Sequence, residues 1–251
     1  MQKEEKALTT VGIYLRPLRC IFNLAIQEGD IPAEIYPFGK RKYRIPAGRN
    51  VKKALSMKDL KALYTFKVPK GSYQEKARDF WFFSYQCNGM NIRDIAELKY
   101  KNIQKDILSF TRSKTKNTTR TNVKPIIVPL TTLVKQTIKK YGNKPASNEA
   151  YVFPIFSDSI NAHEKLRRTQ NFTKFINQHI KKLAEDAGVT TEISTYWARH
   201  SFTSTAMRNG ASLELLQESL GHEDMKTTMN YWSGFEDSVK RDISNKLMDF
   251  N

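Results

Sequence analysis

The segment from Lys76 to Asn88 constrains the fold of this chain more than any other. It carries five aromatic side chains that would fall on every side of a helix: Phe80, Trp81, Phe82, Phe83 and Tyr85. A helix that is apolar all round is too hydrophobic for a surface, so the segment predicts a central core helix covered by its neighbours. We favour this interpretation over the alternative, in which the aromatic side chains form an exposed platform for stacking nucleic-acid bases.

Most of the remaining chain has the apolar spacing of helices. The periodicity predicts helices over residues 10–28, 131–141, 163–187, 198–209, 213–219 and 225–231, and a short one after Gly89. Another helix is expected to begin after Ser56, which caps its first-turn amides and precedes the inward-facing Leu60 and Leu63. Two β-like runs, 103–111 and 121–128, flank the basic hairpin tip SKTKNTTRT. We therefore expect a mainly α fold with a small β-sheet, of the α+β class.

The balance of charge predicts an anionic partner. The 251 residues contain 42 Lys plus Arg against 25 Asp plus Glu, which gives a net charge of +17. Such a surface fits the phosphates of a nucleic acid, although ribosomal and membrane-surface proteins carry similar charge. Cys20 and Cys87 each lie in an apolar run and are expected to be buried, reduced thiols. No stretch approaches the roughly 18 apolar residues of a membrane span, so we expect a cytoplasmic protein without a disulfide, a metal site or a membrane partner.

A basic segment at residues 39–53 separates the first predicted helix from the rest of the chain. Its sequence, GKRKYRIPAGRNVKK, contains Pro and Gly and no acidic residue. One interpretation is a solvated linker between domains. The other is a strap that crosses a DNA groove, which would make binding strongly dependent on salt. Its candidate DNA contacts are Lys40, Arg41, Lys42, Arg44, Arg49, Lys52 and Lys53.

The last third of the chain supplies a nucleophile together with groups that stabilise a phosphate. Arg199 and His200 are followed by Leu220-Gly221-His222 and, nine residues after that His, by Tyr231. Arg and His side chains donate hydrogen bonds to the oxygens of a pentavalent phosphate, on which negative charge gathers. A phenol that attacks the phosphorus keeps the broken strand as a phosphotyrosine ester, so resealing needs no nucleotide or metal. The pattern predicts reversible cleavage of a phosphodiester.

The chain resembles the tyrosine recombinase (phage integrase) family in three separated boxes: Tyr196-Trp197-Ala198-Arg199-His200-Ser201-Phe202, Leu220-Gly221-His222 and Thr227-Thr228-Met229-Asn230-Tyr231. More narrowly, it looks like the integrases of Bacteroides-type mobile elements such as conjugative transposons. The resemblance implies a site-specific DNA recombinase or integrase that works through a 3′-phosphotyrosyl intermediate and a Holliday junction, without a cofactor. It also implies double-stranded DNA at specific recombination sites as the partner, in the bacterial nucleoid. A free monomer would assemble into a homotetramer on that DNA, with DNA-bending accessory proteins as further partners.

The resemblance assigns a role to each candidate catalytic residue. Tyr231 is the nucleophile, and Arg199 grips a non-bridging oxygen of the scissile phosphate. His222 donates to the phosphate or steadies the proton of the attacking phenol. Lys114, on the predicted hairpin, protonates the departing 5′ oxygen. Tyr196 stands where many family members carry a His, and either hydrogen-bonds the phosphate or shapes the pocket.

One position departs from the family pattern. The family's first catalytic arginine falls on Asn91, whose amide donates a neutral hydrogen bond in place of a charged fork. Losing one such donor can cost on the order of 10²–10³ in rate. Arg93 is the nearest substitute in the sequence, and Arg112 or Arg120 on the hairpin are the others. Without a substitute, the chain would be a catalytically weak DNA-binding accessory protein. A DNA invertase would show the same boxes, and a type IB topoisomerase shares the chemistry but would relax supercoils without pairing sites.

The resemblance also implies a domain organisation. Residues 1–38 would be the C-terminal part of a helical, SAM-like core-binding domain, 39–53 the interdomain linker, and 54–251 the catalytic domain. A helix at 236–249 would pack on its own domain or dock into a neighbouring protomer.

Asp94 would orient Arg199 or support its own helix, and His200 would serve in packing and hydrogen bonding. Further DNA contacts are expected from the hairpin residues Arg112, Lys116 and Arg120.

Overall fold

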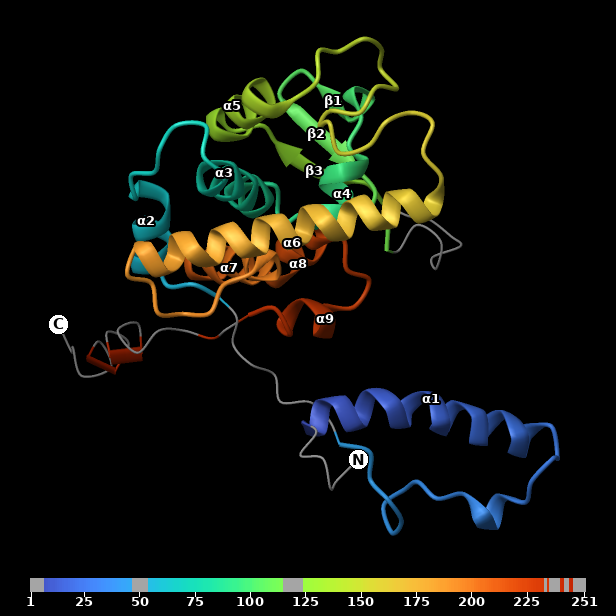
Figure 1. The fold of residues 1–251 in the computed structure, drawn as a ribbon. Helices are drawn as coiled ribbons and strands as arrows, with labels where there is room; N and C mark the ends of the chain where they lie inside the picture. Colours follow the sequence, from blue (N-terminus) through green and yellow to red (C-terminus); the bar gives the residue numbers. More distant parts are fainter. Residues whose placement is uncertain are drawn as a thin grey trace. The chain divides into compact units, whose positions relative to one another are not determined.

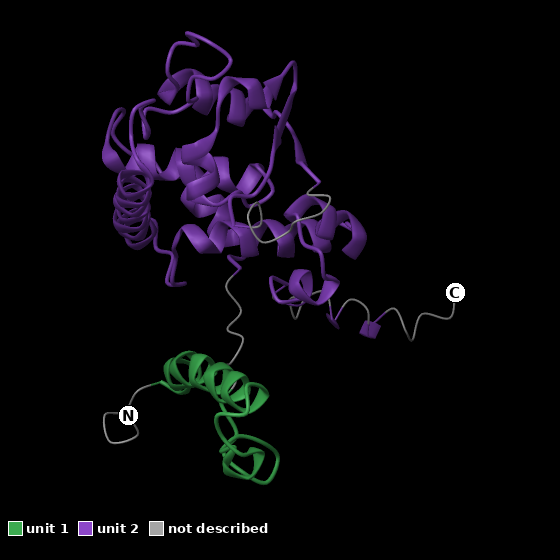
Figure 2. Ribbon diagram, turned by 90° about the vertical axis from the view of Figure 1, so that its right-hand side faces the viewer, with its two compact units in different colours: residues 1–51 green, residues 52–251 purple. Residues whose placement is uncertain are grey.

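The chain folds as two compact units, residues 1–51 and 52–251 (Figure 2). The computed structural model describes residues 7–46, 54–114, 124–232, 234, 240–241 and 244–245. Within these ranges, no helix is both long enough and apolar enough to cross a membrane. The assignment of residues 1–38 to a core-binding domain and of 39–53 to a linker stays a prediction.

The first unit consists of helix α1 (Leu8–Gln27) and a short 3-10 helix, η2 (Ala33–Ile35). The predicted helix over residues 10–28 is therefore confirmed, and the chain turns after it at Gly29. Four aromatic rings, from Phe22, Tyr36, Phe38 and Tyr43, pack edge to face at centroid distances of 5.7 to 6.5 Å. The thiol of Cys20 is exposed, so the prediction that both cysteines are buried was wrong for this one. The reason is that much of the apolar stripe of α1, including Tyr14 and Ile21, lies in solvent.

Helix α3 (Tyr73–Gln86) forms the centre of the second unit, as its aromatic residues predicted. Phe80, Trp81, Phe82 and Phe83 are at most 5% exposed. Helices α5 (Thr132–Tyr141), α6 (Ala162–Asp186) and α7 (Thr195–Arg208) pack around α3 or beside it (Figure 1). The ring of Phe153 lies 5.0 Å from that of Phe80 and 5.3 Å from that of Phe83. The segment is thus core and not a base-stacking platform.

Shorter helices complete the second unit. Helix α2 (Met57–Thr65) begins after Ser56, whose hydroxyl accepts from the backbone N–H of Asp59 at 3.1 Å, as predicted. Helix α4 (Ile92–Glu97) follows Gly89, and a 3-10 helix, η3 (Tyr100–Asn102), leads into the sheet. Helices α8 (Leu213–Leu220) and α9 (Met225–Met229) come last among the described helices with assigned bounds. Helix α9 is shorter than the predicted helix at 225–231.

A three-stranded antiparallel sheet of order β1-β2-β3 lies beside the helices. Its strands are β1 (Ile103–Gln104), β2 (Ile107–Phe110) and β3 (Ile126–Pro129). The single strand predicted at 103–111 is therefore two, because the chain turns at Lys105 with a φ of 53°. The register pairs Leu108 with Val128, and both are buried against the core. The sheet fixes the start of the hairpin that follows β2; the hairpin tip, residues 115–123, lies outside the described residues.

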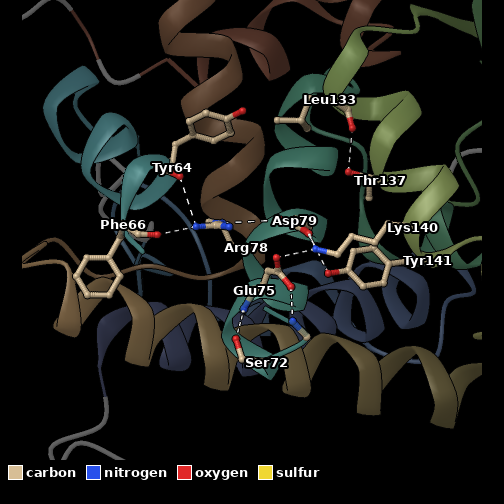
Figure 3. A network of polar contacts seen from close by, with 11 residues as sticks. Tyr64, Phe66, Ser72, Glu75, Arg78, Asp79, Leu133, Thr137, Lys140 and Tyr141 are labelled. Atoms are coloured by element: carbon tan, nitrogen blue, oxygen red, sulfur yellow. Dashed lines mark hydrogen bonds and ion pairs between the residues drawn. The ribbon is translucent and has the colours of Figure 1, made fainter. Parts of the chain in front are cut away.

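A polar network ties α3 to α5 at one side of the core (Figure 3). The ammonium group of Lys140 lies 2.9 Å from Glu75 and 2.8 Å from Asp79. The hydroxyl of Tyr141 donates to the same Asp79 carboxylate at 2.9 Å. Burial, together with that hydrogen bond to Asp79, raises the pKa of Tyr141 to about 12. The network fixes the core around α3.

Candidate active site

Four segments of the second unit meet at one place. They are the turn before α4, the residues after β2, helix α7, and the stretch from the end of α8 to the turn after α9. Six of the residues singled out in the sequence are brought together there: Arg112, Lys114, Tyr196, Arg199, His222 and Tyr231. Among the described residues, no group of three or more His, Cys, Asp or Glu side chains is arranged to hold a metal ion.

Arg199 lies at the centre of the site and is 2% exposed. Its guanidinium donates to the carbonyl of Gly89 at 3.2 Å, to the carbonyl of Leu220, and to Nε2 of His222 at 3.0 Å. Gly89 has a φ of +66°, and a Cβ there would lie 2.5 Å from the Cα of Arg199. Only glycine permits this approach of the two chains. Burial and the nearby charge of Arg112 lower the pKa of Arg199 to about 10, which remains high enough for the group to be charged at neutral pH.

His222 is held in one tautomer between two partners. A guanidinium can only donate, so Nε2 of His222 accepts from Arg199. The other nitrogen, Nδ1, then carries the proton and donates to the hydroxyl of Thr228 at 3.0 Å. Burial and the charges of Arg199, Arg112 and Lys114 lower the pKa of His222 to about 3. The imidazole is therefore neutral, and its Nε2 is an acceptor here. The two roles expected for His222, donation to the phosphate or steadying of the phenol proton, stay predictions.

The ring of Tyr231 faces the phosphate-binding candidates. It stacks on the His222 ring at a centroid distance of 5.1 Å, and Cζ of Arg199 lies 5.2 Å from its centroid. The prediction that Tyr231 lies on a helix was wrong. Helix α9 ends at Met229, and Tyr231 lies in the turn that follows, where its N–H donates to the carbonyl of Thr228 at 3.0 Å.

Tyr196 contacts the nucleophile candidate directly. It lies in the first turn of α7, and its ring centroid is 5.9 Å from that of Tyr231. Burial of the phenol and its hydrogen bond with the side chain of Tyr231 raise the pKa of Tyr196. Tyr196 therefore stays protonated and able to donate at neutral pH.

The structure brings Arg112, and not Arg93, close to Arg199 and His222. Arg112 is 8% exposed, donates to the carbonyl of Leu220 at 3.4 Å, and lies close enough to lower the pKa of both Arg199 and His222. Arg93, by contrast, has a 60% exposed side chain that pairs with Glu97 at 3.0 Å. Asn91 occupies the N-cap position of α4 without a side-chain capping bond. The position of Arg93 does not support its predicted role as the substitute.

Asp94 contacts the start of the hairpin through Ser113, and this contact was not predicted from the sequence. Its carboxylate accepts from the backbone N–H of Ser113 at 2.8 Å and from the Ser113 hydroxyl at 2.7 Å. Ser113 lies between Arg112 and Lys114, so this contact fixes the chain from which both cations extend. Asp94 was expected to orient Arg199 or to support its own helix. Ser113 had no signal of its own in the sequence, because a serine in a polar hairpin resembles its solvated neighbours. Thr228 belongs to one of the family boxes, but its contact with His222 was not predicted.

The remaining predicted DNA contacts lie in the first unit or outside the described residues. Lys42 and Arg44 belong to the first unit and are exposed, with hydrogen bonds to the carbonyls of Glu34 and Lys40. Lys40 and Arg41 are exposed as well. Outside the described residues lie Arg49, Lys52, Lys53, Lys116 and Arg120, and most of the predicted helix at 236–249. Their roles stay predictions.

Comparisons with known proteins find similar sequences over most of the chain. Residues 53–236 match the family model of the phage integrase family. Tyrosine recombinase XerD of Listeria innocua serovar 6a is 25% identical over 239 residues, which cover 92% of this chain and 73% of XerD. Tyrosine recombinase XerC of Thermodesulfovibrio yellowstonii is 27% identical over 239 residues, covering 90% of this chain and 71% of XerC.

Solved structures with the same fold include two integrases bound to DNA. The Tn1549 transposon integrase in complex with transposon right end DNA aligns with a TM-score of 0.65 at 16% identity, covering 98% of this chain and 82% of that one. A lambda integrase dimer bound to a COC′ core site aligns with a TM-score of 0.56 at 17% identity, covering 88% and 74%. The predicted mainly α fold with a small sheet is confirmed.

Proposed function

The chain belongs to the phage integrase family of tyrosine-type site-specific recombinases, and we propose that it is the integrase of a mobile genetic element that cleaves and rejoins DNA through Tyr231. The observation that carries this proposal is the position of the Tyr231 ring, 5.2 Å from Cζ of Arg199 and stacked on His222. A phenol beside a buried guanidinium is what attack on a phosphodiester requires.

The proposed reaction conserves the phosphodiester energy. The oxygen of Tyr231 bonds to phosphorus, and the bond to the 5′ oxygen breaks, which leaves a 3′-phosphotyrosyl strand. Lys114 donates a proton to the departing 5′ oxygen. The neutral His222 accepts the phenol proton at Nε2 once the phosphate draws Arg199 away from that nitrogen. Attack by a 5′ hydroxyl of the partner duplex then reverses the step and produces a Holliday junction.

Charge at the site supports an anionic substrate. Arg112 and Arg199 are both buried and both donate to the carbonyl of Leu220, so two like charges are held close together. A phosphate between them would replace repulsion by attraction and would accept charge-assisted hydrogen bonds from both groups. Arg112 then does the work of the arginine that the family carries at the position of Asn91.

The proposal extends to the partners and the setting. Double-stranded DNA at specific recombination sites in the bacterial nucleoid is the substrate, and the net charge of +17 supports it. The likeness to the Tn1549 transposon integrase supports a mobile-element role, of the Bacteroides type that the motifs resemble. On DNA, four copies of an otherwise monomeric protein would assemble, and DNA-bending proteins would assist.

A catalytically weak accessory protein is the second candidate, because Asn91 removes a charged donor. The buried position of Arg112 favours the enzyme. An invertase or a type IB topoisomerase would use the same residues; the former inverts a segment between two sites, and the latter relaxes supercoils without pairing sites.

Covalent trapping tests the proposal. The protein is incubated in EDTA with nicked duplexes that span candidate element ends, and SDS-resistant protein–DNA adducts are measured for the wild type, for Tyr231→Phe and for the control Tyr64→Phe. Tyr64 lies in α2 and is 52% exposed. We expect the wild type and the Tyr64→Phe control to form an adduct, and Tyr231→Phe to form none. If the protein binds these duplexes and forms no adduct, while a known recombinase forms one on its own site, the accessory role replaces the enzyme.

A further inference from the structure

We propose that His200 is a positioning residue that holds the backbone of the nucleophile Tyr231 in the active site. This inference rests on the proposed function. His200 is 5% exposed, and its Nδ1 lies 3.0 Å from the backbone carbonyl oxygen of Tyr231. A carbonyl only accepts, so Nδ1 carries the proton and donates it. His200 touches the nucleophile through this backbone bond and through its ring, and has no place in the reaction scheme above.

The imidazole of His200 also fills the space between two phenol rings. Its centroid lies 4.8 Å from that of Tyr196 and 4.7 Å from that of Tyr231. Tyr196 is four residues earlier on α7, which places both side chains on the same face of the helix. The backbone hydrogen bond fixes the position of the Tyr231 main chain, and the ring contacts restrict the orientation of its side chain.

Tyr231 needs such a restraint because the helix that precedes it, α9, does not supply one. Helix α9 has five residues and ends at Met229, and a helix this short is unstable without tertiary contacts. Its buried Thr228 is anchored to His222, and the N–H of Tyr231 donates to the carbonyl of Thr228. The bond from His200 to the Tyr231 carbonyl fixes the other side of the same residue.

The same helix, α7, therefore positions both sides of the reaction. Arg199, which is proposed to hold the phosphate, and His200, which holds the nucleophile, are consecutive residues. Because they share one rigid element, the distance between phosphorus and the attacking oxygen is set by α7 and not by the loop after α9. A displacement of about 1 Å at the reacting atom can cost about 10²-fold in rate.

The test compares His200→Leu and His200→Asn with the wild type and with His179→Leu. Asn retains a side-chain N–H donor near the position of Nδ1, whereas Leu removes it. His179 is a matched control, because its ring packs against Phe175 and Tyr73 in the same unit, on helix α6 and not on α7. Two quantities are measured: hydrogen exchange of the 225–232 amides in the DNA-free protein, and the single-turnover rate of adduct formation on a nicked duplex.

We expect His200→Leu to exchange the 225–232 amides roughly fivefold faster, since one hydrogen bond is lost, while peptides from α7 keep their protection. The adduct rate should fall about 10- to 100-fold, and His200→Asn should recover much of it; His179→Leu should match the wild type in both measurements. Unchanged exchange at 225–232, or faster exchange throughout α7, would overturn the inference. Exchange detects the restraint without catalysis, so a wild type that shows the restraint and forms no adduct refutes the proposed function and not the contact.

Discussion

The substitution Arg112→Met separates two effects of this arginine: its repulsion of Arg199 in the folded protein and its proposed contribution to the cleavage rate. The side chains of Arg112 and Arg199 both donate to the carbonyl oxygen of Leu220, at 3.4 Å and 2.5 Å. Their donor nitrogens are therefore at most about 6 Å apart, and two unit charges at that distance repel by about 3 kcal/mol when the effective dielectric constant is about 20. Methionine keeps most of the buried volume and removes the charge.

The substitution should leave the unfolding free energy at or above that of the wild type, because the relief of the repulsion offsets the loss of the long hydrogen bond to Leu220. The rate of adduct formation should nevertheless fall by about 10²–10³, the cost of one missing donor to the phosphate. Urea unfolding measures the first quantity, and single-turnover trapping on a nicked duplex measures the second.

The matched control is Arg93→Met, which removes an exposed arginine from α4 that pairs with Glu97. Its adduct rate should stay within about twofold of the wild type, because a surface ion pair contributes little. The reasoning is refuted if Arg112→Met cleaves within about threefold of the wild type, or if the loss of rate appears in Arg93→Met instead.

Two further predictions concern Gly89 and His222. Gly89→Ala should lower the unfolding free energy by about 2–4 kcal/mol in urea, because alanine is strained at a φ of +66° and its Cβ would lie 2.5 Å from the Cα of Arg199; an unchanged unfolding midpoint would contradict the close approach. His222 has a pKa of about 3 in the folded protein, below its usual 6.5. Between these two pH values the imidazole is protonated in the unfolded chain and neutral in the folded one, so stability should fall as the pH drops from about 6.5 toward 3. At pH 5 the loss should be about 1 kcal/mol after solvent screening, and NMR titration of the imidazole near pH 6.5 would contradict it.

Local signals predicted the helical part of the fold. The burial of α3 follows from its own aromatic residues, and the start of α2 follows from the cap at Ser56. Both signals span only a few residues, so they can be read from the sequence alone. The turn at Lys105, which splits the first β-like run, contains neither Gly nor Pro and gave no such signal. Cys20 was misread for a different reason: an apolar run predicts burial only where another element covers it.

The candidate site was predictable only in part. Arg199, His222 and Tyr231 are close in the sequence at a distinctive spacing, and the structure brings them together. Arg112 is different, because an arginine at the base of a basic hairpin has the same sequence signature as its solvated neighbours. Its burial depends on the β2–β3 register and on the end of α8, which are contacts over long sequence distances.

Identification of the amino acid that becomes linked to DNA tests the central claim most directly. The trapped adduct is digested with nuclease and protease, and the peptide that retains a 3′-terminal nucleotide is sequenced by mass spectrometry. The account predicts a phosphodiester to the phenol oxygen of Tyr231, with the 5′ hydroxyl of the cleaved strand free. A nucleotide on any other side chain, or the absence of a linked peptide from folded protein that binds the same duplex, would contradict it.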